Sequence, residues 1–355
     1  MYMGVDTHKA THTLVSLDEQ GRQHKTFQVA NTPEGWSEAL RWAHEFQGDC
    51  IWGIENSGSL GKGFAQFLLS QGEESVHEVS PRRTAQYRRR GRKQDKSDQA
   101  DALAIARLLI AEAETLPVVQ GDDLSTEMRI LSDHRDKLLS ERTRLINQLH
   151  AQMLQIDPSY QHKSGSLTKK EGILYCQGLV LPSSDSLLGT RLLIVRQLCG
   201  QILRLDDEIA EVKKAIQQKV QQSDTPLVEM SGIGEIVAAR LIGELGSVPR
   251  ISSVAALASL AGIAPVEVSS GGHQGFRLNL GGNRKLNRAF HIIALVQLRC
   301  NSLAKAYYAK KRSEGKTSRE ALRCLKRQLA NVVYRLLRPP DATSLPVGPP
   351  QALVA

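Results

Sequence analysis

The chain has 355 residues, of which 41% are hydrophobic, and a formal net charge of +9. It is long enough for two or three domains with buried cores. Its longest nearly apolar run, residues 254–266, is shorter than the roughly 18 residues of a membrane span, and its start lacks the pattern of a signal peptide. Five scattered cysteines without a Cys-x-x-Cys pair argue against a disulfide framework or a zinc site. We therefore expect a cytoplasmic protein that binds no membrane.

Positive charge is concentrated in two segments. Residues 274–338 hold sixteen Lys or Arg against two acids, and residues 82–96 hold eight against one, so the rest of the chain is acidic. Either segment alone could be a solvated face. Two such segments on an acidic chain are typical of a protein that binds nucleic-acid phosphates, in this case associated with the nucleoid when it acts.

The N-terminal third predicts an α/β domain over residues 1–115. Strands are expected at 2–6, 12–17, 25–29, 50–55 and 75–79. Helices are expected at 33–46, with Thr32 as N-cap, and at 61–71. The order β-β-β-α-β-α-β is that of the ribonuclease-H-like (RuvC-like) fold. A further helix is expected to begin near Ser97.

The middle, residues 116–224, predicts two long helices. Leucines recur every seven residues at 131, 138 and 145, and apolar residues from Leu198 to Ile216 alternate steps of four and three. This spacing is typical of a coiled-coil seam, within one chain or between subunits. Between the helices, residues 157–185 are rich in Ser, Gly, Lys and Pro and predict a loop or a small insertion.

The last third, residues 225–338, predicts a mainly helical domain, followed by a disordered tail over 339–355. A Ser231-Gly232-Ile233-Gly234 turn precedes an apolar helix at 236–245 and resembles a helix-hairpin-helix. Backbone N–H groups at Gly232 and Gly234 could then bind a DNA phosphate, although such a turn can also simply join helices. Further helices are expected at 254–260, 284–303 and 318–337.

Four acids lie where a ribonuclease-H-like fold would gather them. Asp6 ends the first strand and Glu55 the fourth, while Asp98 and Asp101 are three apart on one helix face. Singly, each could be a surface residue or a cap. Together, four close carboxylates repel one another unless cations are bound. The set therefore predicts a site for two Mg²⁺ ions, roughly 4 Å apart, that act on a phosphodiester.

Six collinear motifs across residues 2–338 resemble the transposases of the IS110 family. The first three resemble its DEDD motifs: Gly4-Val5-Asp6-Thr7-His8-Lys9, Ile54-Glu55-Asn56-Ser57-Gly58 and Lys96-Ser97-Asp98-Gln99-Ala100-Asp101-Ala102. The others resemble its C-terminal transposase domain: Ser231-Gly232-Ile233-Gly234, Leu260-Ala261-Gly262-Ile263-Ala264-Pro265 with Ser269-Ser270-Gly271, and Gly282-Asn283-Arg284-Lys285-Leu286-Asn287-Arg288.

The resemblance implies a DNA recombinase guided by a structured bridge RNA that pairs with donor and target DNA. It implies an oligomer, a dimer or a tetramer, with Asp6, Glu55, Asp98 and Asp101 as metal ligands. The family's serine nucleophile falls on Ser270, or on Ser269 after a one-residue slip. Attack by this serine, brought from the other domain or another subunit, would give a phosphoserine link and a free 3′-hydroxyl.

Nucleic-acid contacts are expected from the two glycines of the turn and from basic residues of both segments, namely Arg88, Arg89, Arg90, Arg92, Lys93, Arg277, Arg284, Lys285 and Arg288. Two departures from the family stand out, a longer 157–185 segment and Arg277-Leu278-Asn279-Leu280-Gly281 before the Gly-Asn step. The alternative functions are a metal- and water-using nuclease of the junction-resolvase type and a non-catalytic nucleic-acid-binding protein.

Overall fold

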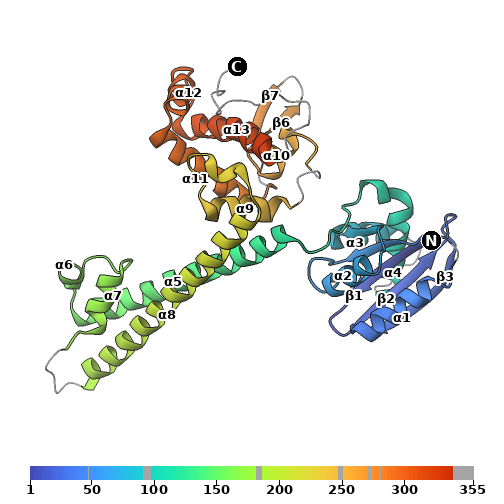
Figure 1. Ribbon diagram of the computed structural model, residues 1–355, viewed down its shortest axis with the longest axis horizontal. Helices are drawn as coiled ribbons and strands as arrows, with labels where there is room; N and C mark the ends of the chain where they lie inside the picture. The colour runs from blue at the N-terminus through green and yellow to red at the C-terminus, as the bar shows by residue number, and fades with distance from the viewer. Residues whose placement is uncertain are drawn as a thin grey trace. The chain divides into compact units, whose positions relative to one another are not determined.

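The computed structural model describes residues 1–46, 48–90, 97–180, 186–246, 251–270, 273–279 and 281–338, with backbone alone at 90, 267–270, 273–276 and 278. The chain divides into two compact units, Met1–Asp122 and a second that starts at Asp123 (Figure 1). Each unit has its own hydrophobic core.

A five-stranded mixed sheet forms the centre of the first unit. Its strands are β1 (Tyr2–Thr7), β2 (Thr11–Leu17), β3 (Gln23–Ala30), β4 (Ile51–Glu55) and β5 (Val76–Val79). Their order across the sheet is β3-β2-β1-β4-β5. The first three strands are antiparallel, whereas β4 and β5 run parallel to β1. This arrangement is compatible with the predicted ribonuclease-H-like fold.

Helices cover both faces of the sheet. On one face, α1 (Pro33–Ala43) and α2 (Lys62–Ser70) pack on a core that includes Trp52 and Phe64. On the other, α4 (Asp98–Glu112) continues into the short 3-10 helix η1 (Ala113–Thr115) and packs through Ile105 and Leu108. The expected cap is confirmed, since Thr32 accepts a hydrogen bond from the backbone of α1.

One helix of this unit was not expected from the sequence. Residues 82–96 were interpreted only as a basic run, yet α3 (Pro81–Arg90) forms within them and packs against α4. The helix is amphipathic, because Thr84 is buried and Tyr87 packs against the core shared with α4, while Arg82 and Arg89 are exposed. The interpretation as a charge run missed this spacing.

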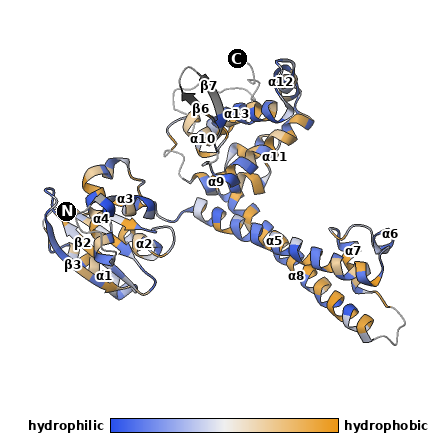
Figure 2. Ribbon diagram, turned by 180° about the vertical axis from the view of Figure 1, so that it is seen from behind, coloured by the Kyte–Doolittle hydropathy of each residue, from blue (hydrophilic) through white to orange (hydrophobic). Residues whose placement is uncertain are grey.

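Two long helices open the second unit, α5 (Leu124–Ile156) and α8 (Ser186–Gln222), and they pack along each other. Hydrophobic and hydrophilic residues alternate along both (Figure 2). The predicted contact residues Leu138, Leu145, Leu198 and Ile216 are buried. The helices are those the heptad spacing predicted.

The segment between the long helices folds into two short ones. These are α6 (Tyr160–Ser164) and α7 (Lys170–Gln177), and residues 181–185 lie outside the described part. Tyr160 and Ile173 are fully buried against α5 and α8. The predicted insertion is therefore a pair of short helices that share a hydrophobic core with α5 and α8.

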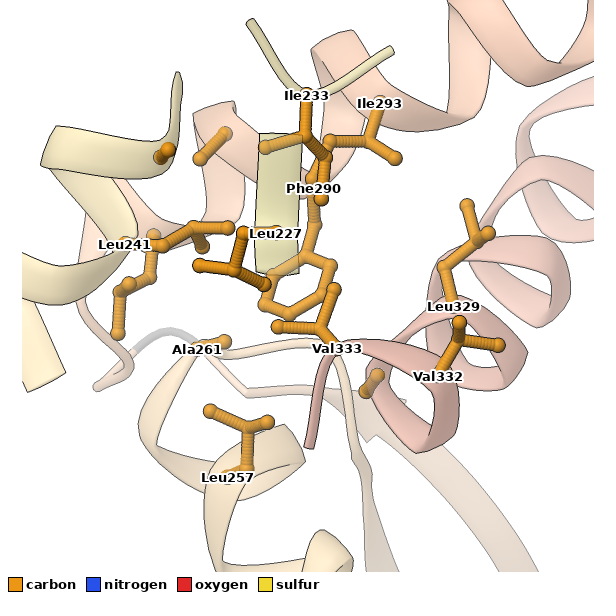
Figure 3. Close-up of a cluster of buried hydrophobic side chains, with 14 of the residues drawn as sticks. Leu227, Ile233, Leu241, Leu257, Ala261, Phe290, Ile293, Leu329, Val332 and Val333 are labelled. Atoms are coloured by element: carbon orange, nitrogen blue, oxygen red, sulfur yellow. The ribbon is translucent and has the colours of Figure 1, made fainter. Parts of the chain in front are cut away.

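The rest of the second unit surrounds one apolar cluster, in which Phe290 lies among Leu227, Ile233, Leu241 and Val333 (Figure 3). The elements are η2 (Pro226–Glu229), α9 (Glu235–Leu245), α10 (Val254–Leu260), β6 (Pro265–Ser270), β7 (His273–Leu278), α11 (Arg284–Cys300), α12 (Ser302–Ser313) and α13 (Ser318–Leu337). In the described part of the chain, no helix is both long and apolar enough to cross a bilayer.

Two features of this region were not predicted. The helix expected at 284–303 ends at Cys300, because the Asn301 side chain accepts hydrogen bonds from Leu303 and Ala304 and starts α12. No strand was predicted near Ser269 and Ser270, yet both belong to β6, which pairs with β7 in an antiparallel hairpin. The predicted tail, 339–355, lies outside the described residues.

Candidate active site

The position of the acidic cluster follows from how closely α4 approaches the sheet. Gly4 on β1 pairs in parallel register with Gly53 on β4. A Cβ on Gly4 would lie 2.1 Å from the carbonyl oxygen of Ala102, and one on Gly53 would lie 2.9 Å from the side chain of Ile105. Because neither residue has a side chain, α4 lies directly on the two strands, and its N-terminus reaches their carboxyl ends.

The structure brings the four predicted acids together at this end of the sheet. Asp6 is the penultimate residue of β1 and Glu55 the last residue of the adjacent β4, and they are 4% and 8% exposed. Both interact electrostatically with Asp101, and Asp6 also interacts with Asp98 and shares a hydrogen bond with Glu55. Asp98 and Asp101 occupy the first turn of α4, whose N-cap is Ser97.

Burial and mutual repulsion disfavour the charged form of the two strand residues. Burial chiefly raises the pKa of Glu55, and with the nearby Asp6 carboxylate it brings that pKa to about 7. The pKa of Asp6 is raised mainly by burial, is lowered by His8, and is raised further by Asp101 and Asp98. A divalent cation would remove this repulsion, so the donor set fits a hard metal ion.

His8 belongs to the same cluster, although the sequence analysis assigned it no role. Its Nε2 lies 3.2 Å from a carboxylate oxygen of Asp6 and 3.2 Å from one of Asp98. The ligand atoms of these three residues all lie within 4.8 Å of one another. The signal in the sequence was the spacing Asp6-Thr7-His8, since alternate residues at a strand end point to the same side.

Helix α3 supplies two more contacts that the sequence did not reveal. Thr84 is buried and hydrogen-bonds the carboxyl group of Glu55. Arg88, predicted to bind nucleic acid, forms an ion pair with Asp101. Its guanidinium therefore already has a carboxylate partner within the protein, whereas Arg89 on the same helix is exposed. Arg92 and Lys93 and the side chain of Arg90 lie outside the described part.

The predicted nucleophile lies at the tip of the hairpin in the second unit. Ser270 is the last residue of β6 and pairs with His273, while Ser269 pairs with Gln274. Residues 271 and 272 and the side chains of both serines lie outside the described part. In the first unit, the acids come together from elements that are distant in sequence. The position of the serine backbone, in contrast, is set by a single hairpin.

The base of this hairpin is held by residues of two of the motifs. A Cβ on Gly282 would lie 2.2 Å from the Cα of Gly262, so the two glycine backbones are in direct contact. The amide of Asn287 donates to the carbonyl oxygens of Ala261 and Gly262 at 3.0 and 3.1 Å. The buried Lys326 donates in turn to Asn287 at 2.8 Å. The motif residues around the serine thus fix the hairpin's two ends to α10 and α11.

The remaining predicted contact residues divide into structural and exposed ones. Gly232 has φ +95 and packs on Val296 of α11, whereas Gly234 has open space beside it. Arg277, Arg284 and Arg288 are exposed. Lys285 is bound by Asp133 at 2.6 Å and by Glu244 at 3.1 Å.

Comparisons with known proteins agree with this arrangement. A transposase family model of the IS110 DEDD type matches residues 3–158, and a second, described as Transposase IS116/IS110/IS902 family, matches residues 224–309. The uncharacterized 42 kDa protein of insertion element IS900 from Mycobacterium paratuberculosis is 24% identical, over 95% of this chain and 96% of its own length.

Two further relatives are similar over nearly the full chain. The uncharacterized 44.8 kDa protein of insertion element IS116 from Streptomyces clavuligerus is 24% identical, over 95% of this chain and 94% of its own. The pilin gene-inverting protein of Moraxella bovis is 23% identical, over 95% of both chains. The chain is thus a DNA transposase. It belongs to the IS110 family of insertion-sequence transposases.

Proposed function

We propose that the chain is an RNA-guided DNA recombinase that cuts and exchanges strands through a phosphoserine link at Ser270. The observation that carries the catalytic part is the convergence of Asp6, Glu55, Asp98 and Asp101 at one end of the sheet. Family membership suggests the use of a divalent metal, and we propose two Mg²⁺ ions held by these four carboxylates. His8 lies close enough to orient Asp6 and Asp98 or to add a ligand.

The proposed cleavage step exchanges one phosphate ester for another. The Ser270 oxygen forms a bond to phosphorus, the bond from phosphorus to the 3′ oxygen breaks, and the serine proton ends on the released 3′-hydroxyl. When bound, the metal would supply charge stabilisation at the phosphate and its leaving oxygen. A 3′-hydroxyl from the partner duplex then reverses the exchange. Each step exchanges one phosphodiester bond for another, so the reaction needs no nucleoside triphosphate as an energy source.

The partners of the reaction follow from the charge distribution and the family. We propose that donor and target DNA and a structured bridge RNA contact the exposed Arg89, Arg277, Arg284 and Arg288. Gly234, in the turn before α9, has space for a phosphate at its backbone. We further propose that the α5/α8 pair is a coiled coil that joins copies of the chain into a dimer or a tetramer.

The experiment combines the protein, Mg²⁺, RNA transcribed from the DNA flanking the reading frame, and labelled donor and target duplexes. The products are separated on a denaturing gel, and a covalent protein–DNA band is sought. We expect the band with the wild type and with Ser269→Ala, and its loss in Ser270→Ala and Asp6→Ala. Omitting the RNA should remove it as well.

The alternative functions give different results. Cleaved DNA without an adduct, with Ser270→Ala as active as the wild type, would make the protein a nuclease that uses water. If Asp6→Ala left every measured activity unchanged, the acidic cluster would have no catalytic role, and the remaining alternative would be a non-catalytic nucleic-acid-binding protein. If the adduct formed with Ser270→Ala but not with Ser269→Ala, the nucleophile would be Ser269.

A further inference from the structure

A pocket of about 270 Å³ lies between α5, α9 and α11 in the second unit. The basic part of its lining includes Arg135 of α5 together with Arg284 and Arg288 of α11, and Asp136 of α5 lines the same pocket. The aliphatic part includes Ile236, Val237 and Ile292. Neither the family comparisons nor the sequence analysis gave Arg135 a role.

The charges around the pocket are only partly balanced within the protein. Arg240 is buried and binds Asp133, Asp136 and Glu244 at 2.5, 2.7 and 3.1 Å. Lys285 shares two of the same carboxylates. These three carboxylates are therefore already paired with Arg240 or Lys285.

The three arginines of the basic part have no such partner. Within the described residues, no acid lies at ion-pair distance from Arg135, Arg284 or Arg288. The pocket thus carries a surplus of positive charge.

Arg135 gives an independent indication of a ligand. Its Nε is buried and has no hydrogen-bond acceptor among the described residues. A buried N–H group without an acceptor is costly, whereas a guanidinium fork binds a phosphate through two parallel hydrogen bonds. This Nε is itself shielded from solvent, so an anion in the pocket would satisfy it only after the Arg135 side chain turns its guanidinium toward the opening.

The size and lining of the pocket restrict the ligand. A cavity of about 270 Å³ is near the lower end of ligand pockets, and it suits one nucleotide rather than a duplex. The aliphatic wall, with Leu139 and Ala289, offers apolar surface to a sugar or a base. A nucleotide taken out of a strand carries both a phosphate and such a face.

We propose that this pocket binds a single nucleotide of an unpaired nucleic-acid strand, with its phosphate on Arg135, Arg284 and Arg288 and its nucleoside against Ile236, Val237 and Ile292. The pocket would thereby hold a single-stranded segment at the junction of the helical pair with the C-terminal domain. This inference deepens the proposed function, because it assigns a specific place to one unpaired strand of the DNA or the RNA.

The test measures fluorescence polarisation of labelled oligothymidine and oligouridine with the full-length protein. Arg135→Gln should weaken binding about tenfold, as expected for the loss of a charge-assisted contact, and lower the salt slope by about 0.7. The matched control is Lys137→Gln, which removes an exposed positive charge two residues away on the same helix. It should change the affinity less than twofold, on the order of a screened surface charge. The oligonucleotide that loses more affinity identifies the strand as DNA or RNA.

A second variant tests the pocket without changing charge. Ile292 is 39% exposed at its rim, so Ile292→Trp should fold normally and fill the space. We expect it to weaken single-strand binding as Arg135→Gln does, with an unchanged melting temperature. Equal affinity of Ile292→Trp and wild type would overturn insertion of a nucleotide, and equal losses in Arg135→Gln and Lys137→Gln would overturn a specific phosphate site.

The serine-adduct assay on the same proteins separates this inference from the proposed function. If wild type forms the adduct and the pocket variants bind like wild type, the pocket inference fails and the recombinase stands. If the pocket variants lose binding while wild type forms no adduct, the pocket stands and the phosphoserine mechanism fails.

Discussion

Replacing Gly4 with alanine should disturb the active site through the backbone of α4. The added Cβ would lie 2.1 Å from the carbonyl oxygen of Ala102 and 2.5 Å from the backbone nitrogen of Ala106. Both are backbone atoms in the middle of a helix, so no side-chain rotation relieves the contact. The helix must retreat by about 1 Å, because interiors are close-packed.

The expected cost follows from this displacement. Overpacking a core typically destabilises by about 1–3 kcal/mol, and contacts with rigid backbone place Gly4→Ala near the upper end, at about 3 kcal/mol. The same movement carries Asp98 and Asp101 away from Asp6 and Glu55. A misplacement of about 1 Å in catalytic geometry can cost on the order of 10²-fold in rate.

Urea unfolding and the rate of adduct formation measure the two effects. The control is Gly121→Ala in the same unit, where an added Cβ meets nothing within 4 Å and the free energy of unfolding should change by less than about 0.5 kcal/mol. The reasoning would be refuted if Gly4→Ala were as stable and as active as Gly121→Ala.

Two more predictions concern single side chains. Because the pKa of Glu55 is about 7 in the fold against an ordinary 4.5, the folded state binds its proton more tightly. The metal-free protein should therefore lose stability as pH rises from 4.5 to 7, and Glu55→Gln should flatten this dependence in urea unfolding with EDTA; an equally steep dependence in the variant would contradict the assignment. Asn287→Ala should destabilise the second unit by about 3 kcal/mol, because two carbonyl groups and Lys326 lose their partner. The half-buried Asn331 hydrogen-bonds only side chains of its own helix, Arg327 and Gln328, so Asn331→Ala should cost less, about 1 kcal/mol. Equal urea-unfolding midpoints for the two variants would show that Asn287 does not hold the hairpin base in this way.

Much of the first unit could be predicted because its signals are local. Alternating apolar residues mark the strands, Thr32 and Pro33 mark the start of α1, and the order of elements indicates how the strands must be arranged. Once Asp6 and Glu55 are placed at the ends of neighbouring parallel strands, their proximity follows from the topology. The acidic cluster is therefore predictable from the sequence.

The missed elements had ambiguous local signals. In α3, five arginines within ten residues hid an apolar spacing carried by few side chains. The β6 strand ends in Ser269 and Ser270, small polar residues that are typical of a loop. In both elements, contacts with distant segments outweigh local propensity. The helix α3 packs against α4, and the hairpin is held at its base by the contact between Gly262 and Gly282.

The sequence by itself determined the family, the order of the elements and the identity of the four acids, because motifs, caps and periodicity are properties of neighbouring residues. Only the tertiary structure decided which charges remain available. Arg88 lies on the basic helix α3 and Arg135 on the long helix α5, yet Arg88 forms an ion pair with Asp101 whereas Arg135 has no ion-pair partner in the described part of the chain. That difference depends on which side chains of another helix face each arginine. The packing of helices that are distant in sequence determines those neighbours.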